Sequence, residues 1–314
     1  MLIPAFLMVM NMHRETIKLP AGQSFRTIRW SHSVSAVESQ LADGRSQVLE
    51  GEGSHWHYHP EMELTLFTKG RGNRFVGDHI GGFEAGDLVL LGGMLPHYWH
   101  TSGETSGLCL QWHFPEYHPL WNLPECKPLA GLFQRAARGL RLKGSTRDLV
   151  AQSMESLSHT NGLVRLGRLL ELLAEIAGAP PDGAEALASH SFMAPGDTNY
   201  QDSMSRTLRQ LVARFRDEIH LDEVLKIACM SRPTFARQFK RHTGRSLSDF
   251  LTELRLQAAC RELLDTSKTV TGIALDCGFS HVSFFNRAFR RNHGCSPSAY
   301  RKQQGQVAAD STGV

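Results

Sequence analysis

The chain contains the stretch Phe235-Ala236-Arg237-Gln238-Phe239-Lys240-Arg241-His242-Thr243-Gly244-Arg245-Ser246, and 50 residues later it repeats the pattern as Phe285-Asn286-Arg287-Ala288-Phe289-Arg290-Arg291-Asn292-His293-Gly294-Cys295-Ser296. Both Phe positions, the Arg between them, the basic pair, the Gly and the Ser coincide at this offset. A self-similarity of this length predicts two related supersecondary units, since two copies are too few for a solenoid.

Each copy has the sequence features of a helix-turn-helix unit. In the first, apolar spacing predicts a helix over residues 222–229, and Met230-Ser231 breaks it. The next helix begins near Pro233, where a missing N–H costs little, and ends at Gly244. In the second, Thr271 and Ser280 are expected to cap the two helices, Gly278 to supply the turn and Gly294 to end the unit.

The second helix of each unit is expected to bury its Phe residues and to present polar side chains outward. Arg, Asn, Ser and His on one face of a helix are suited to contact base edges in the DNA major groove. The outward residues of the two units are Arg232, Pro233, Ala236, Arg237, Lys240 and Arg241, and then His281, Val282, Ser283, Asn286, Arg287, Arg290 and Arg291.

The quoted stretches, together with Gly278-Phe279-Ser280, Phe284 and Gly294-Cys295-Ser296-Pro297-Ser298-Ala299-Tyr300-Arg301, resemble the AraC-type family of bacterial transcription regulators. The resemblance implies two helix-turn-helix units that enter successive major grooves and are joined by a long helix, here residues 246–264. An ordinary helical bundle would also bury the repeated Phe residues, but it does not explain a duplicated basic face.

The distribution of charge supports a nucleic-acid partner for the C-terminal part. Residues 204–304 hold 18 Lys and Arg against 9 Asp and Glu, a net charge of +9. The rest of the chain holds 16 Lys and Arg against 22 Asp and Glu, a net charge of −6. A basic domain beside an acidic one is the electrostatic pattern expected of a DNA-binding domain attached to another domain.

Length and composition indicate a soluble protein with two domains. The chain has 314 residues, of which 41% are hydrophobic and 21% charged. Residues 1–23 are interpreted as an N-terminal extension. Its apolar first ten residues are too short to span a bilayer and lack a signal-peptide pattern. Six cysteines without CxxC spacing suit a reducing cytoplasm, so we expect cytoplasmic localisation and no membrane partner.

Residues 24–114 contain short candidate strands separated by glycine-rich turns, which is typical of a β-barrel or jelly roll. The predicted fold class is therefore α+β multidomain, with a β domain followed by helices and an all-α C-terminal domain. The candidate strands are residues 25–29, 63–68, 74–76, 87–91 and 108–114.

Helical spacing of apolar residues predicts helices over residues 129–141, 146–158 and 162–177 of a helical segment at 115–177. The leucine stripe of the third helix packs either on the β domain or on a second copy, and the family resemblance favours a homodimer. Residues 178–203 are rich in Pro and Gly and predict a linker, and residues 305–314 predict a disordered tail.

A second set of residues lies in the β region, in the pattern Gly51-x5-His57-x-His59-x3-Glu63-x6-Gly70 followed by Pro96-His97. In a strand, His57, His59 and Glu63 share one face. The pattern resembles the first motif of the cupin family, which implies a barrel fold and a metal site. In the second motif His97 is kept, but Gly92, Met94 and Thr101 replace the family's usual residues.

Three interpretations of these residues stay open. In the first, His57, His59, Glu63 and His97 ligate a divalent transition metal. In the second, a polar and aromatic pocket binds an organic effector such as a sugar. In the third, the side chains only satisfy one another inside the barrel. The residues predicted to bind the effector are Trp56, His57, Tyr58, His59, Glu61, Glu63, His97 and Trp99.

Together these observations predict a transcription regulator that binds specific promoter DNA and senses a small molecule in its N-terminal domain. No cofactor is required for this function, and the predicted partners are DNA, effector, a second copy and, for an activator, RNA polymerase. One alternative is a metal-dependent cupin oxygenase or isomerase attached to a DNA-binding domain. The other is an architectural DNA-binding protein without an effector.

Overall fold

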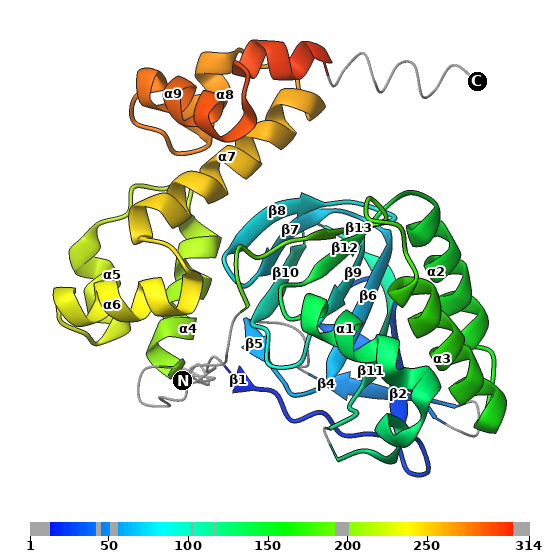
Figure 1. Ribbon diagram of the computed structural model, residues 1–314. Coiled ribbons are helices and arrows are strands. Elements are labelled where there is room, and N and C mark those ends of the chain that lie inside the picture. Colours follow the sequence, from blue (N-terminus) through cyan, green and yellow to red (C-terminus); the bar gives the residue numbers. More distant parts are fainter. Residues whose placement is uncertain are drawn as a thin grey trace, which may run out of the picture. The chain divides into compact units, whose positions relative to one another are not determined.

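The computed structural model describes residues 13–41, 45–50, 56–101, 103–115, 117–191 and 201–303. The chain divides into two compact units with the boundary between Gln201 and Asp202 (Figure 1). The predicted tail at residues 305–314 lies outside the described residues. None of the described helices is both long enough and apolar enough to cross a membrane.

The first unit contains two β-sheets. The five-stranded sheet has the order β1 (His13–Arg14), β5 (His57–Tyr58), β10 (His97–Thr101), β7 (Gly72–Val76) and β8 (His79–Phe83). The eight-stranded sheet has the order β13 (Ala184–Ala186), β12 (Leu140–Leu142), β9 (Leu88–Leu91), β6 (Met62–Lys69), β11 (Ser106–Trp112), β2 (Phe25–Trp30), β3 (Ala36–Gln40) and β4 (Ser46–Glu50). Only β1 and β5 pair in parallel among the described strands.

The central strands of the eight-stranded sheet are buried on both faces. Along β11, Leu108, Leu110 and Trp112 belong to a core on the outer face, whereas Cys109 belongs to a core between the sheets. This separation follows from the two-residue period of a strand, which sends alternate side chains to opposite faces. Polar Gln111 shares the inner face with Cys109, so the space between the sheets contains polar groups as well as apolar ones.

Helices cover the outer face of the eight-stranded sheet (Figure 1). They are the 3-10 helices η1 (Pro119–Asn122) and η2 (Pro124–Cys126) and the α-helices α1 (Lys127–Ala136), α2 (Gly144–Leu157) and α3 (Gly162–Ala177). Arg165 of α3 is buried against β2, where its Nη2 donates to Thr27 Oγ1 at 3.0 Å and its guanidinium lies 4.0 Å from the Phe25 ring centroid. Burial lowers the pKa of Arg165 to about 10.

Three of the predicted segments differ from the structure. The first predicted helix, 129–141, stops at Ala136, because Gly139 has a φ of 65° and residues 140–142 form β12. The predicted linker, 178–203, contains β13, which pairs with β12, and Ala188 is fully buried. The predicted extension, 1–23, contains β1. The short strands in these segments form because they pair with the edge of an existing sheet. They are too short to show a periodic pattern of apolar residues, so the sequence did not predict them.

The second unit is all-helical, with α4 (Gln201–Arg214), α5 (Leu221–Ala228), α6 (Arg232–Thr243), α7 (Leu247–Asp265), α8 (Val270–Asp276) and α9 (Val282–His293). The predicted fold class is confirmed: a β-rich domain followed by helices, and then a helical domain with two helix-turn-helix units. We call α5 with α6 the first reading unit and α8 with α9 the second reading unit. Helix α7 connects them.

The repeated Phe residues form the cores of the two reading units. The Phe235 and Phe239 ring centroids lie 5.2 Å apart, and those of Phe285 and Phe289 lie 5.6 Å apart. Gly244 ends α6 and Gly294 ends α9, both in the left-handed region as predicted.

Two predicted helix caps are wrong. Thr269, not Thr271, caps α8 by accepting a hydrogen bond from Gly272 N at 3.1 Å. His281, not Ser280, is the N-cap residue of α9, without a side-chain cap. Because helix ends shift easily by one or two residues, several Ser and Thr residues near a boundary compete for the cap position.

Candidate DNA-binding surface and buried histidine cluster

The predicted DNA-contacting residues of α6 lie on its solvent-exposed side. Arg232, Ala236 and Lys240 recur every four residues, and each is exposed. Pro233, Arg237 and Arg241, one position further, are exposed as well. Buried Phe235 and Phe239 face the interior. Helical spacing therefore places the six candidates together on one face, opposite the core.

Helix α9 repeats this arrangement. Ser283, Arg287 and Arg291 are exposed at four-residue spacing, and so are Arg290 and the preceding His281. Val282 and Asn286 are half-buried at the edge of the same face. Neither α6 nor α9 contains an acidic residue. Helices α6 and α9 thus each present a cationic face, and neither helix contributes a carboxylate that would repel DNA phosphates.

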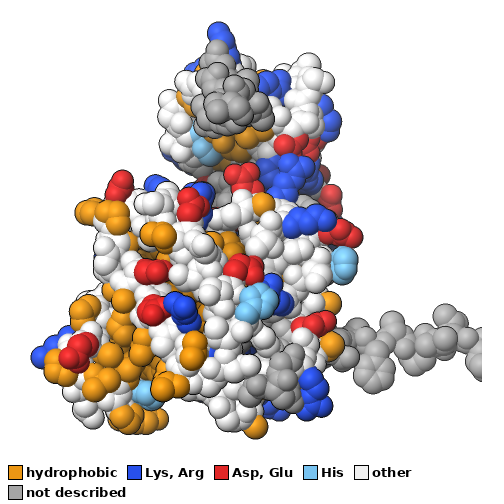
Figure 2. Space-filling model, turned by 90° about the vertical axis from the view of Figure 1, so that its right-hand side faces the viewer, with side chains coloured by type: hydrophobic (Ala, Val, Ile, Leu, Met, Phe, Trp, Pro, Cys, Tyr) orange, Lys and Arg blue, Asp and Glu red, His pale blue; other side chains and the backbone are white. Residues whose placement is uncertain are grey.

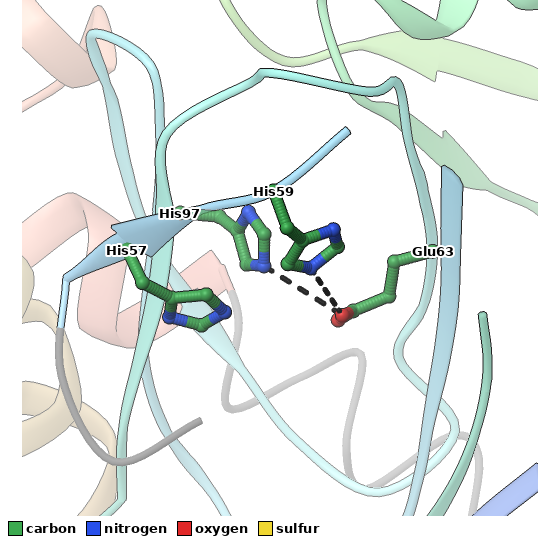
Figure 3. Close-up of side chains that lie close together, drawn as sticks. All are labelled: His57, His59, Glu63 and His97. Carbon is green, nitrogen blue, oxygen red and sulfur yellow. Dashed lines mark hydrogen bonds and ion pairs between the residues drawn. The ribbon is translucent and has the colours of Figure 1, made fainter. Parts of the chain in front are cut away.

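The structure brings the four predicted metal ligands together between the two sheets. His57 is on β5, His97 pairs with it from β10, and His59 follows β5, while Glu63 comes from β6 of the other sheet. All four residues are buried, and one ligand atom from each lies within 4.8 Å of the others. Figure 3 shows His59 and His97 directed at the Glu63 carboxylate, with His57 facing the same space. We call these four residues the histidine cluster.

Hydrogen bonds to backbone carbonyls orient two of the imidazoles. The Nδ1 atom of His97 lies 2.8 Å from Leu95 O, and the Nδ1 atom of His59 lies 3.1 Å from Glu61 O. When each Nδ1 donates, each Nε2 is left to ligate a metal ion or, when it carries a proton, to donate to the Glu63 carboxylate. The two Nε2 atoms lie 3.3 Å (His59) and 3.6 Å (His97) from Glu63 Oε2.

Burial and mutual charge shift the pKa values inside the histidine cluster. Burial lowers the pKa of His57 to about 3, so this imidazole is neutral. Burial opposes ionisation of Glu63 too, but His97 and His59 hold the pKa of its carboxyl well below the usual value. Burial likewise opposes protonation of His97, but the Glu63 carboxylate raises the pKa of that imidazole. Glu63 is thus an anion and His57 a neutral base, which are the forms that bind metal ions, whereas the raised pKa of His97 opposes metal binding by that imidazole.

Four further polar residues, which sequence patterns did not single out, surround the histidine cluster. Glu15 Oε2 lies 3.2 Å from His57 Nε2. Glu63 accepts from Thr65 Oγ1 at 2.6 Å and from Gln111 Nε2 at 2.7 Å, and Gln111 Oε1 accepts from Arg26 Nε at 2.7 Å. Thr65 could have been found from the sequence, because it lies two residues after Glu63 on the same strand and therefore on the same face. No sequence pattern indicates Glu15, Arg26 or Gln111, because strand pairing alone brings them near Glu63.

A cavity of about 50 Å³ adjoins the histidine cluster. Its polar lining includes Glu15, Arg26 and Gln111, and its apolar lining includes Trp30 and Trp99. Both indoles are buried, and their Nε1–H groups have no hydrogen-bond partner among the described residues. Buried donors of this kind cost about 1–3 kcal/mol each unless an acceptor is supplied.

The predicted effector residues are only partly brought together. His57, Glu63 and Trp99 line the cavity. Trp56 instead packs on Phe75, with ring centroids 5.8 Å apart. Glu61 has its Oε2 3.5 Å from His59 Nδ1 and so lies behind the cluster rather than in the cavity. Tyr58, between His57 and His59, is buried but does not line the cavity, as strand alternation requires.

Comparisons with known proteins concern the second unit above all. A family model described as a helix-turn-helix domain matches residues 224–303. An uncharacterised HTH-type transcriptional regulator of Haemophilus influenzae is 33% identical over 99 residues, which cover 32% of this chain and 33% of that protein. The HTH-type transcriptional activator RhaS of an Enterobacter strain is 26% identical over 263 residues, which cover 78% of this chain and 87% of that protein.

A solved transcriptional regulator from Chromobacterium violaceum, described by its AraC-type DNA-binding domain, is 28% identical to this chain. The match covers 35% of this chain and 98% of that chain, with a TM-score of 0.32. The chain spans a third to about half of the length of the first three curated relatives it matches.

Proposed function

We propose that the chain is a transcription regulator of the AraC-type family, which binds specific promoter DNA and regulates transcription in response to a small molecule. The observation that carries the proposal is the duplicated cationic face on α6 and α9, each opposite a Phe core. Two such helices provide base-edge donors and phosphate-binding cations twice along the DNA.

Within these faces the chemistry of the side chains divides the roles. Arg237, His281, Asn286 and Arg287 are assigned to base edges, where bidentate donors distinguish guanine or adenine. Pro233 and Ala236 offer apolar contact to thymine methyl groups. Val282 and Ser283 are the first two residues of α9 and directly follow His281. The residues assigned to phosphates are Arg232, Lys240, Arg241, Arg290 and Arg291, because backbone contacts fix register without specifying sequence.

The test of base readout is Arg287→Ala in the full chain, measured on an operator selected from random DNA and on unrelated DNA. We expect a loss of about 1–3 kcal/mol on the operator and relaxed specificity at one base pair. Binding to unrelated DNA should change far less. Equal weakening on both DNAs would assign Arg287 to the phosphate backbone, and no sequence preference in the unmodified chain would contradict the proposed function itself.

We further propose that the cavity beside the histidine cluster binds the effector. Trp30 and Trp99 supply two indole donors, and Arg26 adds a positive charge to the lining, so the matching ligand carries acceptor oxygens. One water needs about 10–15 Å³ of such volume, whereas drug-sized ligands occupy about 300–1,000 Å³. A cavity of about 50 Å³ therefore favours a compact oxygen-rich molecule, such as a short-chain carboxylic acid, over the sugar expected from the sequence.

The donor set of the histidine cluster fits a divalent transition metal, and we propose that it holds one. His57, His59, His97 and Glu63 would be the ligands, which is a nitrogen-rich set suited to zinc, iron, copper or nickel. Two ligand atoms about 2.1 Å from one ion are at most about 4.2 Å apart, so the widest separation of 4.8 Å must close slightly. A bound ion would act as a Lewis acid toward an effector oxygen.

Metal analysis of the purified full chain tests this site. We expect about one equivalent of metal in the unmodified chain and little in His97→Ala. The matched control is His113→Ala, because His113 is exposed and its hydrogen bond is to Pro60 O at 3.0 Å, outside the histidine cluster. Equal metal content in both variants would refute the site, and the DNA-binding proposal would be unaffected.

The alternative class of function is a metal-dependent oxygenase or isomerase. The buried histidine cluster supports an enzyme only if it binds a metal ion and the chain converts a substrate to product. We assign the cluster to sensing, because a regulator requires an effector site and the neighbouring cavity is small. Turnover of a small acid by the metal-loaded chain would establish the enzyme instead.

The leucine stripe of α3 packs in the core of its own domain, through Leu169, Leu172, Leu173 and Ile176, and not on a second copy. We also propose that the chain acts as a cytoplasmic homodimer formed through the exposed start of α3. Figure 2, seen from the side on which α2 and α3 lie in Figure 1, shows hydrophobic side chains gathered on its lower part. At the start of α3, Leu163 is 84% exposed and Val164 is 62% exposed. An apolar group of this kind on a helix is a common interface between subunits. Should the regulator be an activator, RNA polymerase would be a further partner.

A further inference from the structure

The turn between α8 and α9 lies directly against the connection between α4 and α5. Gly278 in this turn has a φ of +87°. A Cβ atom added there would lie 2.6 Å from the carbonyl oxygen of Arg216 and 2.9 Å from Nε of Arg255. Side chains do not tolerate such distances to backbone, so only glycine allows this approach. The second reading unit therefore touches the backbone that leads into the first.

Two arginines form hydrogen bonds between the α4–α5 connection and helices α7 and α8. Arg255, in the middle of α7, donates from Nε to Phe215 O at 2.7 Å and from Nη2 to Asp217 O at 3.0 Å. Arg216 donates from Nη1 to Asp276 O at the end of α8, at 3.1 Å. These bonds use backbone acceptors at helix ends, which would otherwise need water or another donor.

Ion pairs surround this contact. The Nη1 atom of Arg216 lies 3.1 Å from Glu262 of α7, and Lys268 Nζ lies 3.3 Å from Glu262 and 2.7 Å from Asp276. Exposed pairs contribute little individually, but here they share partners across three elements. We call Phe215, Arg216, Asp217, Arg255, Glu262, Lys268, Asp276 and Gly278 the interunit junction.

We propose that the interunit junction fixes the orientation of α9 relative to α6 and thereby determines the spacing of base contacts that the protein accepts on DNA. This inference rests on the proposed function. If helix α7 were the sole connection between the two reading units, their relative orientation could change, because long helices bend. The interunit junction is a second connection between them and therefore restricts this motion. Arg216 and Gly278 act here as positioning residues.

Spacing specificity is the readout that a purely stabilising role would not change. On an operator selected with the unmodified chain, one base pair inserted between the two groove contacts rotates them by about 34° and separates them by about 3.4 Å. We expect this insertion to weaken binding of the unmodified chain at least about tenfold. Arg216→Ala should reduce that penalty to below about threefold.

Arg214→Ala is the matched control, because Arg214 pairs only with Asp217 and Glu223 among the described ion pairs and does not reach the second reading unit. It removes the same charge two residues away and should keep the full penalty. A full penalty in Arg216→Ala would overturn the proposal. Failure of the unmodified chain to select any operator would instead contradict the proposed function.

Distances between two spin labels, measured by double electron–electron resonance, test the interunit junction without DNA. Spin labels at Arg241→Cys and Arg291→Cys, in a Cys229→Ser and Cys295→Ser background, report the separation of α6 and α9 in the full chain. Gly278→Ala should broaden this distance distribution. Gly294→Ala should not, because Gly294 has a φ of +71° but nothing within 4 Å of its Cβ position. Equal distributions for the two variants would overturn the proposal.

Discussion

Replacement of Arg291 by Ala should reduce the salt dependence of DNA binding by a calculable amount. Five exposed cations on α6 and α9 are assigned to phosphates: Arg232, Lys240, Arg241, Arg290 and Arg291. Each neutralised phosphate contributes about −0.9 to the slope of log K against log salt, so the unmodified chain should show a slope of about −4.5. Between 50 and 200 mM salt its affinity should fall about 500-fold, and that of Arg291→Ala about 150-fold.

Fluorescence anisotropy with labelled operator and with unrelated DNA, at four or more salt concentrations, measures these slopes. Arg291→Ala should weaken binding to both DNAs alike. Arg168→Ala is the charge-matched control, because Arg168 on α3 pairs with Glu171 at 2.7 Å and lies outside the DNA-binding unit. An unchanged slope for Arg291→Ala, or a loss confined to the operator, would refute the phosphate assignment.

Two further predictions concern the first unit. Zinc or nickel at 100 times its dissociation constant should stabilise the unmodified chain by about 2.7 kcal/mol, which corresponds to a rise of about 5–11 °C in the melting temperature of the β domain, and His97→Ala should show no rise. A rise in His97→Ala equal to that in the unmodified chain would exclude the histidine cluster as the metal site. Leu163→Glu should convert a dimer to a monomer in analytical ultracentrifugation, because a carboxylate beside exposed Val164 at the start of α3 would lose its water on association. A dimer that survives this substitution would exclude α3 as the interface.

The helix-turn-helix units could be predicted almost completely from the sequence. Their determinants are local: Phe residues at helical spacing, Gly244 and Gly294 at the helix ends, and Pro233 in a first turn. The helix boundaries differ from the prediction by one or two residues, as with Thr269 in place of Thr271. Local determinants act within one or two turns of the chain, so they need no knowledge of distant contacts.

The β domain was only partly predictable. Long apolar strands such as β6 and β11 were evident, because alternation over seven or eight residues is a clear signal. Strands β5 and β12 have two and three residues and no usable period. They form because they pair with a neighbouring strand of the sheet, and that strand is distant in the sequence.

The two helix-turn-helix units, their cationic faces and the presence of a His and Glu set in the β region all follow from the amino-acid sequence. Three features follow from the folded chain alone: Glu15, Arg26 and Gln111 surround that set, the adjoining cavity is small, and Gly278 contacts the backbone of Arg216. Helix faces follow from the spacing of neighbouring residues. Cavities and close backbone contacts instead depend on strand register and on the packing of segments that are distant in sequence.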